Sequence, residues 1–261
     1  MTARRRSAGG SIARLGAWAA DYAWAVDRQL RHLVRRPALP VVAAGRGVAP
    51  VLLLPGIYET WEFLGPVATA LARAGHPVHA VEALRHNARP VPESADVVAE
   101  HLERSGLEDV VLVAHSKGGL IGKHVMLSPA GGRVRGMVAV ATPFAGSRWA
   151  RYMLSRSLRS FDPRDPVLLA LAGELLVNDR ITAVYPTFDP HIPETGHLAG
   201  ARNVELPLSG HFRPLGHPCW SPRWSVRWPR WPPVPTEAPR RGPLGVCSPS
   251  ATRRRAGSTS A

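Results

Sequence analysis

The sequence predicts an α/β fold in which a mostly parallel sheet carries helices on both faces. Short apolar runs, such as VLLL at 51–54 and VVLV at 110–113, alternate with longer stretches of helical periodicity. Strands that alternate with helices imply right-handed crossovers and therefore a parallel sheet. Runs that are apolar at every position, rather than at every second one, are typical of strands buried on both faces.

The expected elements begin after Pro37 and Pro40 and follow one another in a regular order. Gly75 is expected to end the first helix of this region, and Ser94 is placed to cap the second. A tight turn after 113 leads directly into a helix that extends to Met126. Strands are predicted over 51–54, 78–81, 110–113, 134–141, 181–184 and 204–206, and helices over 61–74 and 94–103.

Residues 143–180 interrupt this alternation. They contain one apolar helical piece, 167–177, preceded by Pro163, Asp165 and Pro166. Two interpretations stay open for the segment: an insertion over the mouth of a site, or an ordinary helix with its loop.

Composition divides the chain into an N-terminal basic amphipathic helix (1–40), the α/β unit (41–217) and a tail rich in Pro, Arg and Trp (218–261). Within the first region, residues 11–34 repeat apolar side chains at three- and four-residue steps, which predicts a helix. This helix either packs on the domain or lies on a membrane surface, since Trp18 and Trp24 stand among arginines. The tail holds nine of the 26 prolines. Disorder, an interaction tail and an out-of-frame C-terminus are all compatible with it.

The formal charge of +14 lies almost entirely at the two ends of the chain. Residues 1–36 contribute +6 and residues 218–261 contribute +7, which leaves +1 for the middle. A nucleic-acid-binding domain would carry such charge on its folded face, so we expect no specific nucleic-acid partner. Both cysteines, Cys219 and Cys247, lie in the tail, which excludes a fold built on disulfides. No apolar run reaches the length of a membrane span, and Asp21 interrupts the only candidate for a signal peptide.

A nucleophile elbow is the clearest chemical motif. Ala114-His115-Ser116-Lys117-Gly118 has the pattern small-x-Ser-x-Gly between an apolar strand and a helix. The sharp turn exposes the serine hydroxyl, and strand and helix then approach so closely that Ala114 and Gly118 must be small. Ser116 is therefore the candidate nucleophile.

A serine needs a base, and the expected chain order is Ser, then an acid, then His. His211 follows the 204–206 strand in a loop that can place its ring over the elbow, and Asp189 follows the 181–184 strand. Asp189 would orient His211 and stabilise its charged form. Glu194 is the nearest alternative acid, and His191 is expected to be poorly placed as the base.

Two backbone N–H groups are candidate donors to a developing oxyanion. One belongs to Lys117, the residue after the nucleophile, and the other to Ile57 in the loop after the first strand. The Lys117 side chain is expected to lie in solvent.

These residues resemble the α/β-hydrolases, most closely the small bacterial triacylglycerol lipases and esterases. The matching pieces, in order over roughly residues 48–215, are VLLLPGI, VVLVAHSKGGL, VAVATPFAGS, FDPHIP and GARNVELPLSGHF. The resemblance implies catalytic roles for Ser116, Asp189 and His211, oxyanion donors at Ile57 and Lys117, no metal and no organic cofactor. Beyond Pro214 the closing helix of the family is not recognisable, so we expect the histidine loop to lose support.

We therefore expect a serine hydrolase that cleaves a small-molecule or lipid ester through an acyl-enzyme. A thioesterase or acyltransferase with the same three residues is an alternative, and so is a catalytically silent membrane-associated protein of this fold. Residues 11–34 would provide peripheral membrane contact. The expected location is the cytoplasm, at the inner membrane surface, with secretion left open.

Overall fold

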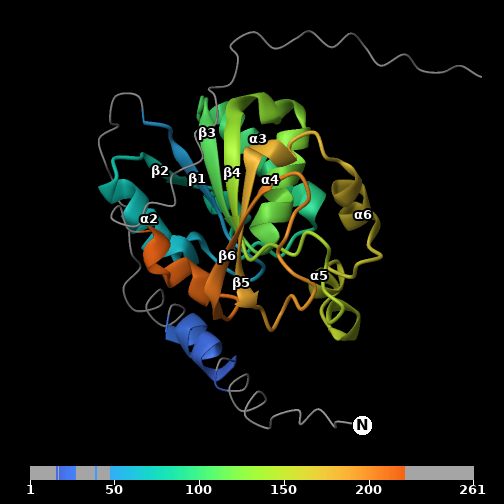
Figure 1. Cartoon of the computed structure of the whole chain (residues 1–261). Helices are drawn as coiled ribbons and strands as arrows, with labels where there is room; N and C mark the ends of the chain where they lie inside the picture. The colour runs from blue at the N-terminus through green and yellow to red at the C-terminus, as the bar shows by residue number, and fades with distance from the viewer. Residues whose placement is uncertain (1–15, 17, 28–38, 40–47, 221–261) are drawn as a thin grey trace, which may run out of the picture.

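The computed structural model describes residues 16, 18–27, 39 and 48–220. Its centre is a parallel sheet in the order β2-β1-β3-β4-β5-β6 (Figure 1). The strands are β1 (Val51–Leu54), β2 (Val78–Ala80), β3 (Val110–His115), β4 (Val134–Val140), β5 (Ile181–Phe188) and β6 (Arg202–Ser209). The predicted parallel α/β architecture is confirmed.

Five α-helices follow the strands in the region 48–220. They are α2 (Gly65–Arg73), α3 (Val91–Arg104), α4 (Lys117–Leu127), α5 (Arg156–Arg159) and α6 (Pro166–Gly173). Short 3-10 helices complete the chain: η1 (Trp61–Leu64), η2 (Glu82–Leu84), η3 (Pro129–Arg133), η4 (Ala150–Tyr152), η5 (Asn178–Arg180), η6 (Arg213–Gly216) and η7 (Pro218–Trp220).

The sheet separates two hydrophobic cores, because successive side chains of a strand point to opposite faces. Leu52 and Leu54 of β1 pack into the core beneath α3 and α4, whereas Val51 and Leu53 pack into the core beneath α2. Figure 1 shows α2 on one side of the sheet and α3 and α4 on the other. Burial on both faces explains why these strands are apolar at every position.

The strand order reverses direction between β1 and β3. Loops that leave the carboxyl ends of these two neighbouring strands therefore diverge and open a crevice, which is where ligands bind in open parallel sheets. The loop after β1 carries Ile57, and the turn after β3 carries Ser116. The topology thus brings the predicted oxyanion loop and the elbow together at the carboxyl ends of the central strands.

Several element boundaries differ from the predictions. Helix α3 begins at Val91, so Ser94 lies inside it and donates to Asn87 Oδ1 instead of capping it. Helix α6 ends at Gly173, well before 177, and Asp165 caps its first turn by accepting from Val167 N and Leu168 N. Strands β5 and β6 are longer than predicted because each pairs along most of its length with the other.

The N-terminal helix is described over residues 18–27, and it contacts the α/β unit directly. Asp21 on this helix is fully buried, and Trp24 and Ala25 pack against the core that lies beneath α2. Figure 1 shows the helix in blue, close to the orange turns that follow β6. This agrees with a helix packed on the domain, the first of the two interpretations of residues 11–34.

The rest of the 11–34 helix and the tail from 221 lie outside the described residues. Within the described part of the chain, none of the helices has the length and apolar character needed to cross a bilayer.

Candidate active site

Ser116 stands at the sharp turn between β3 and α4. Its backbone has φ 50° and ψ −119°, a strained combination that a non-glycine residue rarely adopts. A Cβ at Gly118 would collide with the carbonyl oxygens of Leu54 and Pro55, which shows how closely α4 approaches β1. Ala114 is fully buried in β3. The elbow geometry therefore requires the small residues that the motif contains.

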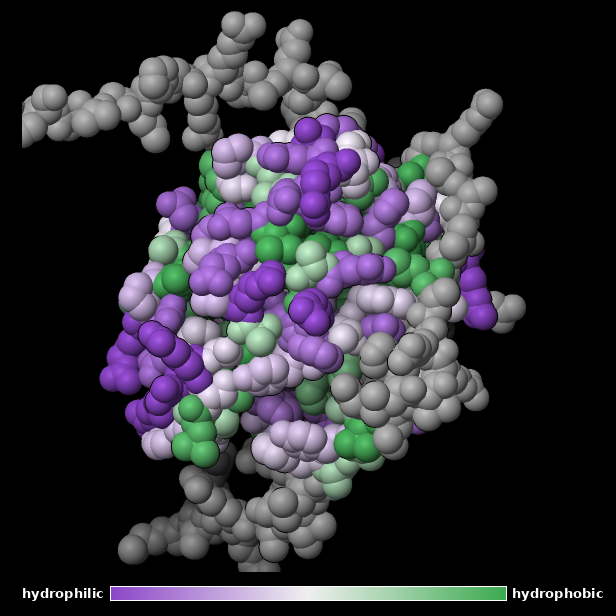
Figure 2. Space-filling view, turned by 180° about the vertical axis from the view of Figure 1, so that it is seen from behind, coloured by the Kyte–Doolittle hydropathy of each residue, from purple (hydrophilic) through white to green (hydrophobic). Residues whose placement is uncertain are grey.

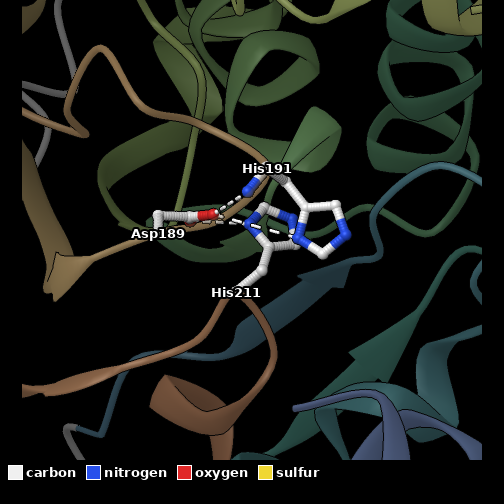
Figure 3. A group of neighbouring side chains, drawn as sticks. All are labelled: Asp189, His191 and His211. Atoms are coloured by element: carbon white, nitrogen blue, oxygen red, sulfur yellow. Dashed lines mark hydrogen bonds and ion pairs between the residues drawn. The ribbon is translucent and has the colours of Figure 1, made fainter. Parts of the chain in front are cut away.

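Asp189 and His211 meet at the carboxyl ends of β5 and β6 (Figure 3). Asp189 Oδ2 lies 2.7 Å from His211 Nδ1, and both side chains are buried. Asp189 Oδ1 accepts hydrogen bonds from the backbone N–H groups of His191 and Ile192, which fix the carboxylate. This leaves Nε2 of His211 as the ring nitrogen available to another group.

The pKa values of the pair shift in opposite directions. Burial acts to lower the pKa of His211, but the charge and hydrogen bond of Asp189 outweigh it and raise that pKa above its usual 6.5. Burial acts to raise the pKa of Asp189, but His211 outweighs it and lowers that pKa. The arrangement therefore stabilises an imidazolium facing a carboxylate.

Ser116 and His211 line the same cavity, which has a volume of about 560 Å³. Its remaining walls are mainly apolar, and one of them comes from the segment 147–161. Among the described residues Ser116 Oγ makes no hydrogen bond with the His211 ring, which is common before a substrate binds. The apolar lining residues are Trp18, Tyr22, Ile57, Pro143, Trp149, Ala150, Tyr152, Met153, Leu158, Phe161, Pro190, Ile192 and Phe212.

The segment 143–180 has two separate roles in the structure. Its first part, up to Phe161, borders the cavity, whereas α6 packs against α4 away from it. Tyr58 in the loop after β1 contacts this first part, with its hydroxyl 2.5 Å from Ser155 Oγ. The first part thus resembles the predicted insertion over the site, and the second part resembles the ordinary helix.

His191 lies beside the acid–base pair, contrary to the expectation that it would be poorly placed. Its ring centroid is 4.9 Å from that of His211, and its Nδ1 is 3.9 Å from Asp189 Oδ1, too long for a hydrogen bond. Burial, followed by the charge of His211, lowers the pKa of His191 to about 4. His191 is therefore neutral at pH 7 and forms part of the cavity wall.

A chain of buried polar groups joins the loop after β1, the elbow and the histidine loop. Glu59 Oε2 accepts from Gly56 N and lies 2.9 Å from His115 Nδ1. His115 Nε2 lies 3.2 Å from the His211 carbonyl oxygen. Both ring nitrogens of His115 therefore face oxygen atoms, one from the loop after β1 and one from the histidine loop. Sequence motifs pointed to neither Glu59 nor His115.

The two predicted oxyanion donors lie near Ser116. Ile57 lines the cavity, and Lys117 is the first residue of α4, where a backbone N–H has no intrahelical acceptor. The prediction for the Lys117 side chain was wrong, because it is fully buried and donates to the carbonyl oxygens of Asn87 and Arg89. Burial lowers the pKa of Lys117 to about 8.

The alternative candidates lie elsewhere. Glu194, the alternative acid, pairs with Arg148, with its Oε1 2.7 Å from the guanidinium. One ligand atom each from Asp189, His191 and His211 lie within 4.8 Å of one another, a set that a divalent ion such as Zn²⁺ could use. Two of these three residues, Asp189 and His211, already form the hydrogen-bonded acid–base pair.

Comparison with solved structures finds the same fold in other proteins. A lipase from Bacillus licheniformis, BlEst2 in its mature form, superposes with a TM-score of 0.54 at 14% identity, over 68% of this chain and 90% of that one. The chain has the α/β-hydrolase fold.

Two further α/β-hydrolase structures are similar at lower scores. Aspergillus fumigatus lipase B has a TM-score of 0.48 and 20% identity over 65% of this chain and 44% of that one. An extracellular α/β-hydrolase from a Paenibacillus species has a TM-score of 0.45 and 19% identity over 63% and 91%. Sequence comparison finds no matching family model and no matching curated protein.

Proposed function

We propose that this α/β-hydrolase-fold chain is a serine hydrolase that cleaves carboxylic esters through an acyl-enzyme on Ser116. One observation carries the proposal: a serine in strained elbow geometry opens into the same apolar cavity as a histidine that an acid holds at 2.7 Å. The three residues come from the ends of β3, β5 and β6, in the chain order expected for this fold.

In the proposed reaction His211 Nε2 removes the proton of Ser116 as its oxygen attacks the ester carbonyl. The tetrahedral oxyanion would accept hydrogen bonds from the N–H groups of Ile57 and Lys117. His211 then gives its proton to the leaving alcohol, and the C–O bond of the ester breaks. Water, activated in the same way, releases the acid and restores Ser116. Asp189 keeps the ring oriented throughout.

The cavity lining supports an ester whose acyl part is apolar. Aromatic and aliphatic side chains form most of the wall, and polar groups gather at Ser116 and His211. Burying a methylene against such a wall contributes about 0.8 kcal/mol, so longer chains should bind better until the cavity is full. A thioesterase or an acyltransferase would use the same catalytic groups. Measuring whether the acyl group passes to water or to another acceptor distinguishes hydrolysis from acyl transfer.

The test is hydrolysis of a chain-length series of p-nitrophenyl esters by the wild type and by Ser116→Ala. Ser128→Ala is the matched control, because Ser128 follows α4 and lies outside this cavity. Loss of turnover in Ser116→Ala alone supports the proposal. A folded wild-type protein without turnover on any ester would refute it and favour the silent scaffold.

We further propose that the face around the cavity mouth meets a membrane surface. Exposed apolar side chains border the cavity on two segments, Trp18 and Tyr22 on the N-terminal helix and Tyr152 and Met153 at the end of η4, with exposed Leu154 next in the chain. Exposed arginines accompany them at 151, 156 and 159. Seen from behind in Figure 2, the corner formed by this segment is at the lower left, where strongly hydrophilic surface adjoins a small hydrophobic patch. A cytoplasmic location at the inner membrane surface remains a proposal that cell fractionation tests.

A further inference from the structure

The N-terminal helix contacts the histidine loop through one buried carboxylate. Asp21 is fully buried, and its two oxygens accept hydrogen bonds from three consecutive backbone N–H groups after β6. Oδ2 accepts from His211 N at 2.8 Å, and Oδ1 accepts from Phe212 N at 2.9 Å and from Arg213 N at 3.2 Å. Hydrogen bonds from N–H groups to a charged acceptor are about twice as strong as neutral ones.

The histidine loop is shaped to receive this carboxylate. Gly210 has φ +126°, a conformation that favours glycine, and a Cβ at this position would collide with Asp21 Oδ1. The absence of a side chain at Gly210 thus lets the helix approach the backbone directly in front of His211. In the α/β-hydrolases that the sequence resembles, a C-terminal closing helix was expected to support the histidine loop. Within the described residues of this chain, the N-terminal helix supports that loop instead.

The same helix also forms one wall of the cavity. Tyr22 Oη lies 2.9 Å from His191 Nε2, and the Trp18 ring stacks on His191 with centroids 5.6 Å apart. Trp18 and Tyr22 therefore face the space between His191 and the mouth, next to Ser116 and His211. These contacts are specific to the face of the helix that also carries Asp21, because residues 18, 21 and 22 share one side of an α-helix.

We propose that the helix over residues 18–27 is a working part of the active site, in which Asp21 positions His211 and Trp18 and Tyr22 contact the substrate. The proposal rests on the proposed function for its catalytic consequences, but the contact made by Asp21 can be tested without any substrate. Asp21 is a positioning residue, since it acts through the backbone of His211.

Asp21 also belongs to the charges that surround His211. Removing its negative charge removes one influence that raises the pKa of His211, so Asp21→Asn should move the acidic limb of kcat/KM to lower pH. A misplaced base should reduce kcat by roughly a hundredfold, with little change in KM for a short ester. The groups facing His211 from all packed elements are Asp21, Glu59, His115, Asp189 and His191.

The first experiment measures hydrogen exchange of the backbone amides of residues 211–213 in the full-length chain. Wild type should protect them, and Asp21→Asn should lose that protection. Asp165→Asn is the matched control, because Asp165 caps α6 through two backbone N–H groups in the same way but does not contact the histidine loop. Unchanged protection in Asp21→Asn would overturn the proposal.

If Asp21→Asn fails to fold, hydrogen exchange of the wild type alone still tests the proposal. Amides of 211–213 that exchange in the folded wild type as fast as exposed loop amides would show that Asp21 does not hold them. If the wild type shows protection but no ester turnover, the proposed function fails while the Asp21 contact stands.

The second experiment separates positioning from substrate contact by kinetics. Asp21→Asn should lower kcat and shift the pH profile, whereas Trp18→Ala should raise KM, and raise it more for long-chain esters than for short ones. Asp165→Asn should change neither parameter. A pH profile of Asp21→Asn identical to wild type, or an unchanged KM in Trp18→Ala, would contradict the assigned roles.

Discussion

Replacing Lys123 with methionine should stabilise the protein at neutral pH. Lys123 lies on α4 with its side chain fully buried, and its Nζ has no hydrogen-bond partner in the described part of the chain. Burial lowers its pKa from 10.5 to about 8, against a smaller opposite effect of Glu174. Methionine has a similar unbranched shape and carries no charge to desolvate.

The size of the effect follows from the difference between the two pKa values. Each pKa unit corresponds to 1.36 kcal/mol, so the gap between 10.5 and about 8 gives roughly 3 kcal/mol. Below pH 8 Lys123 is charged in both folded and unfolded chains, so the full free-energy cost of burying its charge lowers the stability of the wild type. Between pH 8 and 10.5 the unfolded chain binds more protons, so the stability of the wild type rises with pH. Above 10.5 the penalty disappears.

The assay is urea unfolding of wild type and Lys123→Met, followed by circular dichroism at pH 7, 8, 9 and 10. We expect Lys123→Met to exceed the wild type by up to about 3 kcal/mol at pH 7, and the difference to shrink as the pH rises. Lys117, whose pKa is also about 8, is present in both proteins and cancels in the comparison. Arg73→Met, an exposed change at the end of α2, is the control and should stay within about 0.5 kcal/mol at every pH.

One result would refute this reasoning. A destabilised Lys123→Met whose deficit does not change with pH would show that Lys123 makes a favourable contact that outweighs its desolvation.

Three further predictions concern the site. Asp189→Asn should reduce kcat by roughly ten-thousandfold with the fold intact, because His211 loses its orienting partner. In the wild type, kcat/KM should fall as the pH drops through a value above 6.5, because the pKa of His211 is raised. A fall of kcat/KM that begins only below pH 6 would contradict this. Gly118→Ala should abolish turnover and destabilise the fold by about 1–3 kcal/mol, as measured by urea unfolding, because its Cβ meets the Leu54 carbonyl. EDTA should leave turnover unchanged, whereas added Zn²⁺ should inhibit by binding His211, and His191→Phe should weaken that inhibition in a titration.

Lysine usage shows how sequence and structure each contribute. The chain's 33 Lys and Arg residues include only two lysines, Lys117 and Lys123, and both are fully buried on α4. Lysine can lose its proton when buried, whereas arginine remains charged in proteins. The expectation that Lys117 lies in solvent came from its charge alone, and it failed because the packing of α4 against its neighbours overrides that preference.

Local patterns were sufficient for the sheet and for the elbow. Continuous apolar runs predicted the buried parallel strands, and small residues on either side of Ser116 predicted a turn that only such residues permit. Both are short-range properties, since they depend on which side chains fit a strand buried on two faces or a backbone at φ 50°. The pairing of Asp189 with His211 followed from strand order, because parallel strands end at the same edge.

Only the tertiary structure decided which distant residues complete the site. His191 was dismissed because it stands two residues after Asp189, yet the loop turns its ring against His211. Glu59 in the loop after β1 meets His115, the last residue of β3, because β1 and β3 are neighbours, and Asp21 reaches the His211 backbone from 190 residues away. Sequence periodicity indicated that residues 11–34 form a helix with one apolar stripe. It could not indicate where that helix docks. Docking depends on a buried carboxylate that accepts from three backbone N–H groups, and these groups point to one place only once the histidine loop has folded.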